Sequence, residues 1–206
     1  MGRSAAGAAL AAGTLAILAA CNWPAASAPT GVDALPAERI AVRRPAVATE
    51  SVDAGVHLWG VERDPRSVAT VSRVESPGRS ALAFRYELGT GRARDQFAAL
   101  VAPAPDGLSR YDRITFRGYA SRPLRLAVTL RRVDTNGPQH WLRSVYLDGT
   151  PRTVTVFFDD MRPAPGAVAG PAPLASIGAL MFVIDTRNTK PGTSGEITLS
   201  EMAYAY

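Results

Sequence analysis

The chain has 206 residues, a formal net charge of +5 at pH 7 and a single cysteine, Cys21. One cysteine excludes an intramolecular disulfide, and the two histidines, His57 and His140, are too far apart for a common metal-ligand spacing. The basic residues are almost all arginines, Lys190 being the one lysine, and no arginine cluster is interleaved with aromatic residues. A GC-rich genome explains the excess of arginine over lysine as well as a binding partner would. We therefore expect no nucleic-acid partner.

The first 20 residues have the layout of a bacterial secretory signal, with an early arginine, an apolar run from Ala5 to Leu18 and small residues after it. The run is too short to span a bilayer. It ends in the letters LAAC, which resemble the bacterial lipobox. The resemblance implies that Cys21 is acylated and becomes the first residue after cleavage. Two other interpretations are an ordinary signal cleaved near Ala28 and an apolar N-terminal helix.

Residues 21–48 are rich in alanine and proline, which predicts an extended linker between the lipid and a folded domain. The letters RIAVRRP at 39–45 are also compatible with a short first strand. Asn22 follows the cysteine where an aspartate could stand, and resemblance to proteobacterial sorting then implies the outer membrane. We therefore expect a lipid-anchored cell-envelope protein, on the periplasmic or surface face of the outer membrane in a Gram-negative cell. Its folded domain is predicted to cover residues 49–206.

From about Ser51 onward, apolar and polar residues alternate with the period of a β-strand. Residues 67–74 and 81–88 flank a Ser-Pro-Gly turn and predict a hairpin in which Leu82, Phe84 and Tyr86 share one face. Seven further strands are predicted at 96–102, 113–120, 125–132, 141–147, 153–158, 179–185 and 196–204. The proline-rich stretch 163–173 predicts a long loop.

This succession of short strands, with no convincing amphipathic helix, predicts an all-β fold. We expect one antiparallel β-sandwich of the jelly-roll type, following the signal peptide and the linker.

The order of these segments resembles the jelly rolls of carbohydrate-binding modules and galactose-binding-like domains, and in particular the domain of the complex I intermediate-associated protein family. The matching segments are LSRYDRITFRGYA (108–120), HWLRSVYL (140–147), TVTVFFDDMRP (153–163), LASIGALMFVID (174–185) and GEITLSEMAY (195–204). The resemblance implies a sugar-binding or protein-binding β-sandwich. The chain has few tryptophans on these strands, and it closes with LSEMAY where many relatives carry an Asp-Asp pair. A structural calcium ion therefore has no support from the sequence.

Catalysis needs groups that converge on one site, and the chain has few of them. The candidate carboxylates are Glu87, Asp159, Asp160, Asp185 and Glu201. A glycosidase needs two carboxylates that face one groove, whereas Asp159 and Asp160 are adjacent and are better explained as the polar end of a strand. Ser194, in the letters GTSGE, precedes a strand and does not sit in a strand-to-helix elbow. We predict no catalytic residue, no metal ligand and no cofactor.

Side-chain alternation predicts which residues of two strands face outward. In 125–132, Leu126, Val128 and Leu130 face the core and the intervening polar residues face out. In 113–120 the even-numbered residues likewise face the core and the odd-numbered residues face out. The two strands are predicted to be neighbours that present one polar face, with His140 and Trp141 beside it on the next strand.

The candidate ligand-binding residues are Arg117, Tyr119, Arg125, Arg131, His140, Trp141 and Arg143. The alternative for Trp141 is a core or edge residue, and the alternative for the arginines is a solvated sheet face.

Sugar rings offer an apolar face for stacking and a rim of hydroxyls for hydrogen bonds, so a sheet with aromatic and polar residues can hold a glycan without chemistry. We predict a non-catalytic, lipid-anchored module that binds a carbohydrate, and the arginines favour an anionic one. A second hypothesis is an envelope protein–protein interaction or assembly module. A third is a glycan-active enzyme.

Overall fold

The structure is a computed structural model that describes residues 49–51, 59–76, 79–91, 96–135 and 137–206. The predicted signal peptide, the linker with its 39–45 segment, and Cys21 lie outside the described residues. Within the described ranges, no helix is long and apolar enough to cross a bilayer.

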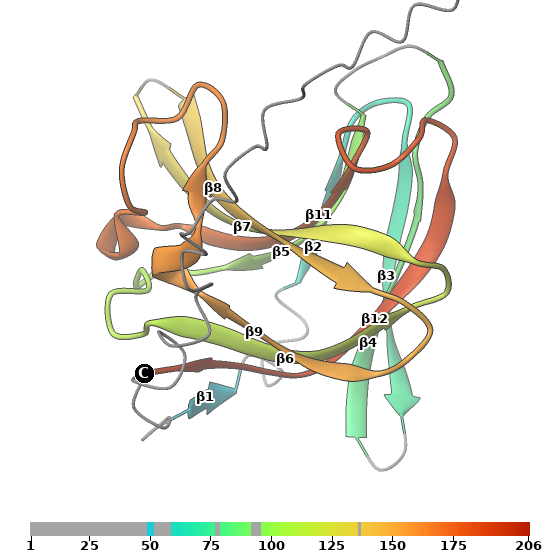
Figure 1. Ribbon diagram of the computed structural model, residues 1–206, viewed down its shortest axis with the longest axis horizontal. Coiled ribbons are helices and arrows are strands. Elements are labelled where there is room, and N and C mark those ends of the chain that lie inside the picture. Colours follow the sequence, from blue (N-terminus) through green and yellow to red (C-terminus); the bar gives the residue numbers. More distant parts are fainter. Residues whose placement is uncertain (1–48, 52–58, 77–78, 92–95, 136) are drawn as a thin grey trace, which may run out of the picture. The chain divides into compact units, whose positions relative to one another are not determined.

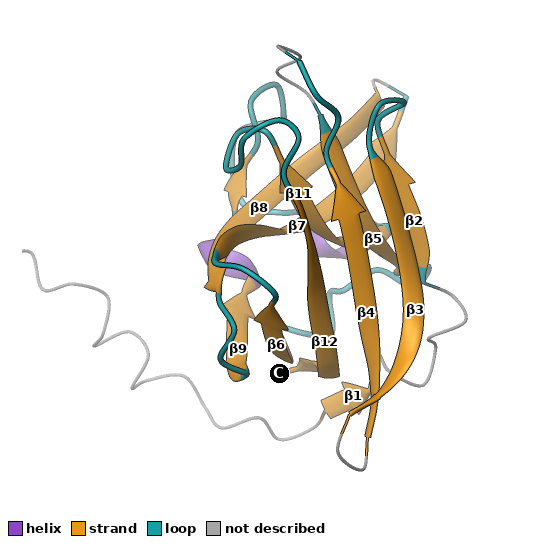
Figure 2. Cartoon of the chain, turned by 90° about the vertical axis from the view of Figure 1, so that its right-hand side faces the viewer, coloured by secondary structure: helices purple, strands orange, loops and turns teal. Residues whose placement is uncertain are grey.

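Two antiparallel sheets form the fold (Figure 1). The first sheet has the strand order β3-β4-β12-β6-β9, and β1 pairs with the end of β12. Its strands are β1 (Thr49–Ser51), β3 (Val68–Ser76), β4 (Arg79–Glu87), β6 (Arg113–Ala120), β9 (Arg152–Phe157) and β12 (Ser194–Ala205). Figure 2 shows β3, β4 and β12 side by side along one side of the molecule.

The second sheet has the strand order β10-β8-β7-β11-β5-β2. Its strands are β2 (Gly60–Arg63), β5 (Phe97–Pro103), β7 (Leu124–Asp134), β8 (Gly137–Leu147), β10 (Arg162–Pro163) and β11 (Ala179–Asp185). Two short 3-10 helices, η2 (Phe158–Asp160) and η3 (Leu174–Ser176), lie in the connections between β9 and β10 and between β10 and β11.

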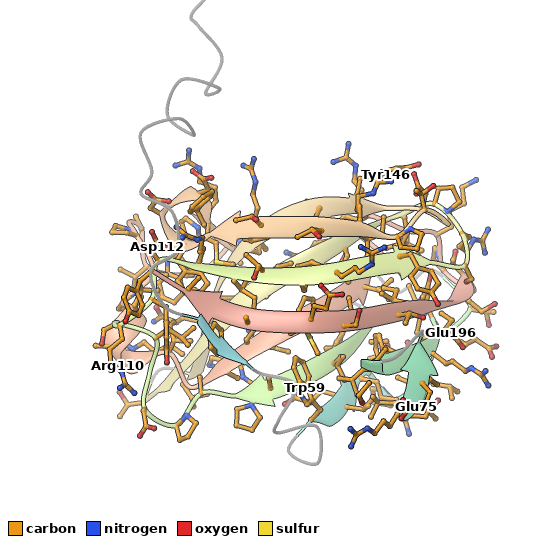
Figure 3. All side chains as sticks on the ribbon, turned by 90° about the horizontal axis from the view of Figure 1, so that it is seen from below. Trp59, Glu75, Arg110, Asp112, Tyr146 and Glu196 are labelled. Carbon is orange, nitrogen blue, oxygen red and sulfur yellow. The ribbon has the colours of Figure 1, made fainter. Side chains whose placement is uncertain are left out.

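The core lies between the two sheets because the strands direct alternate apolar side chains inward. Phe116 of the first sheet meets Phe182 of the second edge to face, with ring centroids 5.1 Å apart. Trp59, which is labelled in Figure 3, stacks on the same Phe182 ring at 5.9 Å. Burying such aromatic side chains contributes roughly 1.5–3 kcal/mol each. The all-β sandwich that the sequence predicts is confirmed.

The nine strands predicted from alternation are all present, with ends that differ by a few residues. The 67–74 and 81–88 hairpin is confirmed, since Val71 pairs with Phe84 and Leu82, Phe84 and Tyr86 are all buried. Sequence periodicity missed β1, β2 and β10, which have only two to four residues each and so show no pattern. The loop predicted at 163–173 runs from the end of β10 to the start of η3.

One prediction about strand neighbours is wrong. β6 and β7 are consecutive in the chain, yet β6 pairs with β12 and β9, while β7 pairs with β8 and β11. The short connection at 121–123 therefore passes from one sheet to the other. Alternation reports which side of a strand is apolar, but it does not report which strand lies beside it.

Candidate functional site

A cleft of about 370 Å³ lies on the outer face of the second sheet. It is lined by side chains from β2, β5, β7, β8 and β11 and from the loops that follow β10 and β11. The strands contribute Glu62, Phe97, Ala127, Thr129, Arg131, Pro138, His140, Leu142, Met181, Val183 and Asp185 to the lining. The cleft lies within one sheet face, so strand register determines which side chains meet there.

Alternation places these residues in the cleft. Leu126, Val128 and Leu130 of β7 are fully buried in the core, so Ala127, Thr129 and Arg131 point to the opposite face. On β11, Leu180, Phe182 and Ile184 are buried in the core, and Met181, Val183 and Asp185 point outward in the same way.

Pairing between strands then aligns the outward side chains in rows. Thr129 is paired with both Met181 and Leu142, and Arg131 is paired with both Ala179 and His140. Residues paired across strands lie on the same face of the sheet, so each row crosses several strands.

The floor of the cleft is largely apolar. Ala99, Val101, Ala179 and Met181 form a second buried apolar cluster on this outer face, separate from the main core, and Phe97 and Val183 pack against it. Met181, Phe97 and Val183 of this group line the cleft together with Ala127, whose short side chain leaves room between the longer side chains around it. Such a floor can contact the C–H face of a flat ligand.

An ion pair spans the cleft. Arg131 Nη1 lies 2.6 Å from Glu62 Oε2, and both side chains line the cleft. Arg131 belongs to β7 and Glu62 to β2, with β11 and β5 between them in the sheet. The Arg131 side chain therefore extends along the sheet face, and its charge is balanced by a carboxylate.

His140 stands beside this ion pair on β8. Burial lowers the pKa of His140 from its ordinary value, and the positive charges of Arg131 and Arg187 lower it further, although Glu62 opposes them. The imidazole is therefore neutral at pH 7, and it can donate one hydrogen bond and accept another.

The opposite end of the cleft is formed by Gln96, Phe97, Asp185 and Arg187. Asp185 is paired with Phe97 across β11 and β5, and its Oδ1 accepts hydrogen bonds from Arg187 N at 3.1 Å and Asn188 Nδ2 at 3.5 Å. The loop that follows β11 is thus held against this wall.

Three of the residues predicted to bind a ligand share the outer face of the second sheet. Arg131 and His140 line the cleft. Arg125 is paired with Tyr146, and both are exposed beyond the cleft. Figure 3 shows Tyr146 at the periphery, where the Arg152 guanidinium lies 5.6 Å from its ring centroid.

The other predicted residues do not join them. Arg117 and Tyr119 point outward as predicted, but from β6, so they lie on the outer face of the opposite sheet beside Ser200 and Thr198. Trp141 is 2% exposed and donates from Nε1 to the Gly170 carbonyl at 3.0 Å, in agreement with the core interpretation. Arg143 shares the side of Trp141 and does not line the cleft. The single surface predicted from these residues is therefore wrong, because the chain crosses between sheets after β6.

Sequence reasoning did not place Glu62, Gln96 or Asp185 at a common site. Glu62 lies on a four-residue strand without a pattern, and Gln96 precedes the first residue of β5. The sequence offers Asp185 only as one of several candidate carboxylates. The available signals are the positions of these residues in the predicted strands. Asp185 ends the strand predicted at 179–185, and Gln96 begins the strand predicted at 96–102.

The described residues contain no group of three or more histidine, cysteine, aspartate or glutamate side chains that could hold a metal ion. Of the two carboxylates that line the cleft, Glu62 pairs with Arg131 and Asp185 accepts hydrogen bonds within its own turn. Ser194 is the first residue of β12 and lies at the end of a loop that enters a strand, not at a strand-to-helix elbow. Asp159 and Asp160 lie in η2, directly after β9, where the strand ends as predicted.

No family model matches this sequence, and the comparison with curated proteins found no significant match. Solved structures do match. One is the family 11 carbohydrate-binding module of the cellulosomal cellulase Lic26A-Cel5E of Clostridium thermocellum, with a TM-score of 0.62 and 19% identity over 78% of this chain and 95% of that one. Another is the family 11 module from Clostridium thermocellum in complex with a β-1,3-1,4-mixed-linked tetrasaccharide, with a TM-score of 0.60 and 20% identity over 78% of this chain and 96% of that one.

At these identities the similarity concerns the fold. This chain has the β-sandwich fold of carbohydrate-binding modules, over nearly the whole length of the modules that it matches. Fold alone leaves the ligand open, because one fold can carry many sites.

Proposed function

We propose that this protein is a non-catalytic binding module that holds a carbohydrate in the cleft over β7 and β11. The observation that carries the proposal is the cleft itself, with its apolar floor between polar walls on one face of the second sheet. The similar module from Clostridium thermocellum was solved in complex with a mixed-linked tetrasaccharide, which supports the same class of ligand for this chain.

The chemistry of the cleft suits a sugar ring. Met181 and Val183 offer an apolar surface to the ring's C–H face, while Thr129, His140 and Asp185 offer donors and acceptors to its hydroxyls. Both carboxylates that line the cleft already have partners in the protein, which favours binding over hydrolysis.

The charge balance of the cleft favours a neutral glycan. The sequence suggested an anionic ligand because the strands carry arginines. In the structure, Arg131 is paired with Glu62, and His140 has a lowered pKa. Two arginines and two carboxylates line the cleft, so no excess of positive charge faces a ligand.

Calorimetric titration of the chain with the β-1,3-1,4-mixed-linked tetrasaccharide and a panel of neutral and acidic oligosaccharides tests this proposal. We expect binding to at least one neutral oligosaccharide. Ala127→Phe should weaken that binding roughly tenfold or more, because a phenyl ring on the floor fills the space that the sugar needs.

The control variant is Arg117→Ala on the opposite sheet, which should bind as the wild type does. If no oligosaccharide of the panel binds to the folded wild-type chain, the proposal is wrong. Tighter binding to the acidic members than to the neutral ones would contradict the charge argument alone.

We also propose that Cys21 carries a lipid that tethers the module to a bacterial membrane. The support is the lipobox-like LAAC at the end of an apolar signal-like run. Two or more acyl chains on one cysteine anchor a protein firmly, since each buried methylene contributes about 0.8 kcal/mol.

A further inference from the structure

The part of the cleft over β8 is mainly aliphatic. Pro138, His140 and Leu142 are alternate residues of β8 and all line the cleft, so their side chains share its outward face. Ala164 and Pro165, which follow β10, line the same part, and Ala164 N donates to the His140 carbonyl at 2.8 Å. These five residues form a wall in which His140 carries the one polar side chain.

This wall suits a methyl group better than the face of a sugar ring. A ring face is commonly held by an aromatic side chain that stacks on it. Among the described residues that line the cleft, the only phenyl, phenol or indole ring is that of Phe97 on β5. β5 is separated from β8 by β11 and β7. Aliphatic side chains around a small space instead favour a compact apolar substituent of the sugar.

Thr129 lies beside this wall. It is paired with Leu142 of β8 on one side and with Met181 of β11 on the other, so apolar side chains flank it in its row. Thr129 is 4% exposed and lines the cleft, and its hydroxyl forms no hydrogen bond with another described residue. Polar groups buried to this extent are nearly always hydrogen-bonded. The partner of the Thr129 hydroxyl is therefore expected from what occupies the cleft.

The next row of the sheet supplies hydrogen-bond donors. Arg131 follows Thr129 on the same face of β7 and is paired with His140. Glu62 holds the Arg131 guanidinium through Nη1, and no bond to a described residue occupies Nε or Nη2. Burial lowers the pKa of His140, so the neutral imidazole carries one N–H at pH 7. Both side chains can donate to an acceptor that lies above Thr129.

A secondary amide has the size that these two rows require. Residues two positions apart on a strand are about 6.8 Å apart. An amide nitrogen and oxygen are about 2.3 Å apart, and a hydrogen bond of about 2.9 Å at each atom gives a span of about 8 Å. The amide N–H can donate to the Thr129 hydroxyl while the amide oxygen accepts from the next row. A hydroxyl spans less, and it leaves the aliphatic wall in contact with water.

We propose that Thr129, Arg131 and His140 form a subsite for an acetamido group, so that the glycan held in the cleft contains N-acetylated amino sugars. The subsite rests on the proposed glycan function of the same cleft and narrows its ligand. The Thr129 hydroxyl is the specificity-determining acceptor for the acetamido N–H. Arg131, held by Glu62, and His140 donate to the acetamido oxygen, and the methyl group packs on the wall. An acetamido group is uncharged, which agrees with the balanced charges of the cleft.

Calorimetric titration of the full chain with two matched tetrasaccharides tests the subsite. Chitotetraose consists of β-1,4-linked N-acetylglucosamine and cellotetraose of β-1,4-linked glucose, so they differ only in the acetamido or hydroxyl group at C2 of each ring. We expect the wild-type chain to bind chitotetraose at least tenfold more tightly, because only this probe contacts both rows and the wall.

Thr129→Val tests the assigned acceptor, since valine keeps the shape of threonine and removes the hydroxyl. The variant should bind chitotetraose about tenfold more weakly than the wild type does, with its affinity for cellotetraose unchanged. Thr129→Ser, which restores the hydroxyl, should recover most of the affinity for chitotetraose.

Thr198→Val is the matched control. Thr198 is also 4% exposed, but it lies on β12, where it is paired with Tyr119 on the outer face of the first sheet. This variant should bind both probes with wild-type affinity.

The outcomes separate the subsite from the function on which it rests. A wild-type chain that binds neither tetrasaccharide nor any other member of the panel overturns both. A wild-type chain that binds a glycan without acetamido groups at least as tightly as chitotetraose overturns the subsite and leaves the function intact. Unchanged affinity of a folded Thr129→Val variant for chitotetraose also overturns the subsite.

If Thr129→Val does not fold, Leu142→Ala provides the measurement, because it shortens the aliphatic wall beside Thr129. Severalfold weaker binding of chitotetraose, with unchanged binding of cellotetraose, supports the subsite. Equal effects on the two probes overturn it.

Discussion

At the scale of single residues, Asp64 ties the edge of the second sheet to the rest of the sandwich. Its Oδ1 accepts from Arg66 N at 2.9 Å, and its Oδ2 accepts from Phe97 N at 2.9 Å and from the Ser67 hydroxyl. These bonds join the turn between β2 and β3 to the start of β5, next to Gln96. Burial is the largest single influence on the pKa of Asp64 and raises it, but the hydrogen bonds from Ser67, Arg66 and Phe97 together outweigh burial and lower the pKa.

Asp64→Asn should reduce the free energy of unfolding by about 1 kcal/mol at pH 7, because an amide cannot accept at both of its ends. The pKa of Asp64 is lower in the folded state than in the unfolded state. Its contribution is therefore complete above its ordinary pKa of 3.8 and is lost as the pH falls through the lowered folded-state value.

Urea unfolding of both proteins across the acidic range measures this effect. The stability difference between wild type and variant should be largest at neutral pH and should shrink at about pH 3. A difference that stays constant down to that pH would contradict the assigned role of the carboxylate.

At the scale of elements, the turn between β5 and β6 depends on one glycine. Gly107 has a φ of +69°, and a Cβ placed on it would lie 2.6 Å from the carbonyl oxygen of Ala175 in η3. The turn approaches this helix closely, since Leu108 N donates to the Leu174 carbonyl at 2.7 Å. Positive φ and close backbone contact both require glycine here.

Gly107→Ala should lower the free energy of unfolding by about 2 kcal/mol or more, because left-handed strain and the contact with Ala175 add together. Thermal or urea unfolding gives the value.

Two other glycines separate the causes. Gly166 has a φ of +88° with open space around it, so Gly166→Ala should carry only the conformational cost, roughly 1 kcal/mol. Gly149 has open space and no positive φ, and Gly149→Ala should be neutral or slightly stabilising. Equal losses at Gly107 and Gly166 would show that the close approach to η3 is not a constraint.

Strands as elements could be predicted from sequence, because alternation is a local consequence of the extended backbone. The predicted ranges 113–120 and 179–185 match β6 and β11 residue for residue. The pairing of those strands could not be predicted, because it depends on where each turn directs the chain.

At the scale of the whole molecule, the proposed lipid on Cys21 decides where the binding module is held. We expect Cys21→Ala to move the protein from the membrane fraction to the soluble fraction of a bacterial host, because the acylated side chain is lost. Asn22→Ala, which keeps the cysteine, should remain with the membrane. Fractionation followed by immunoblotting measures the distribution, and an unchanged membrane fraction for Cys21→Ala would refute the anchor.

The candidate site shows what each level of information contributes. Sequence alone determined that Arg131 faces away from the core, because side-chain direction follows from period two within a single strand. It could not determine that Arg131 meets Glu62, since the two are 69 positions apart and belong to strands separated by two others. Only the tertiary structure decided that meeting, and only it placed Arg117 and Tyr119 on the opposite sheet, because strand pairing is set by contacts between distant parts of the chain.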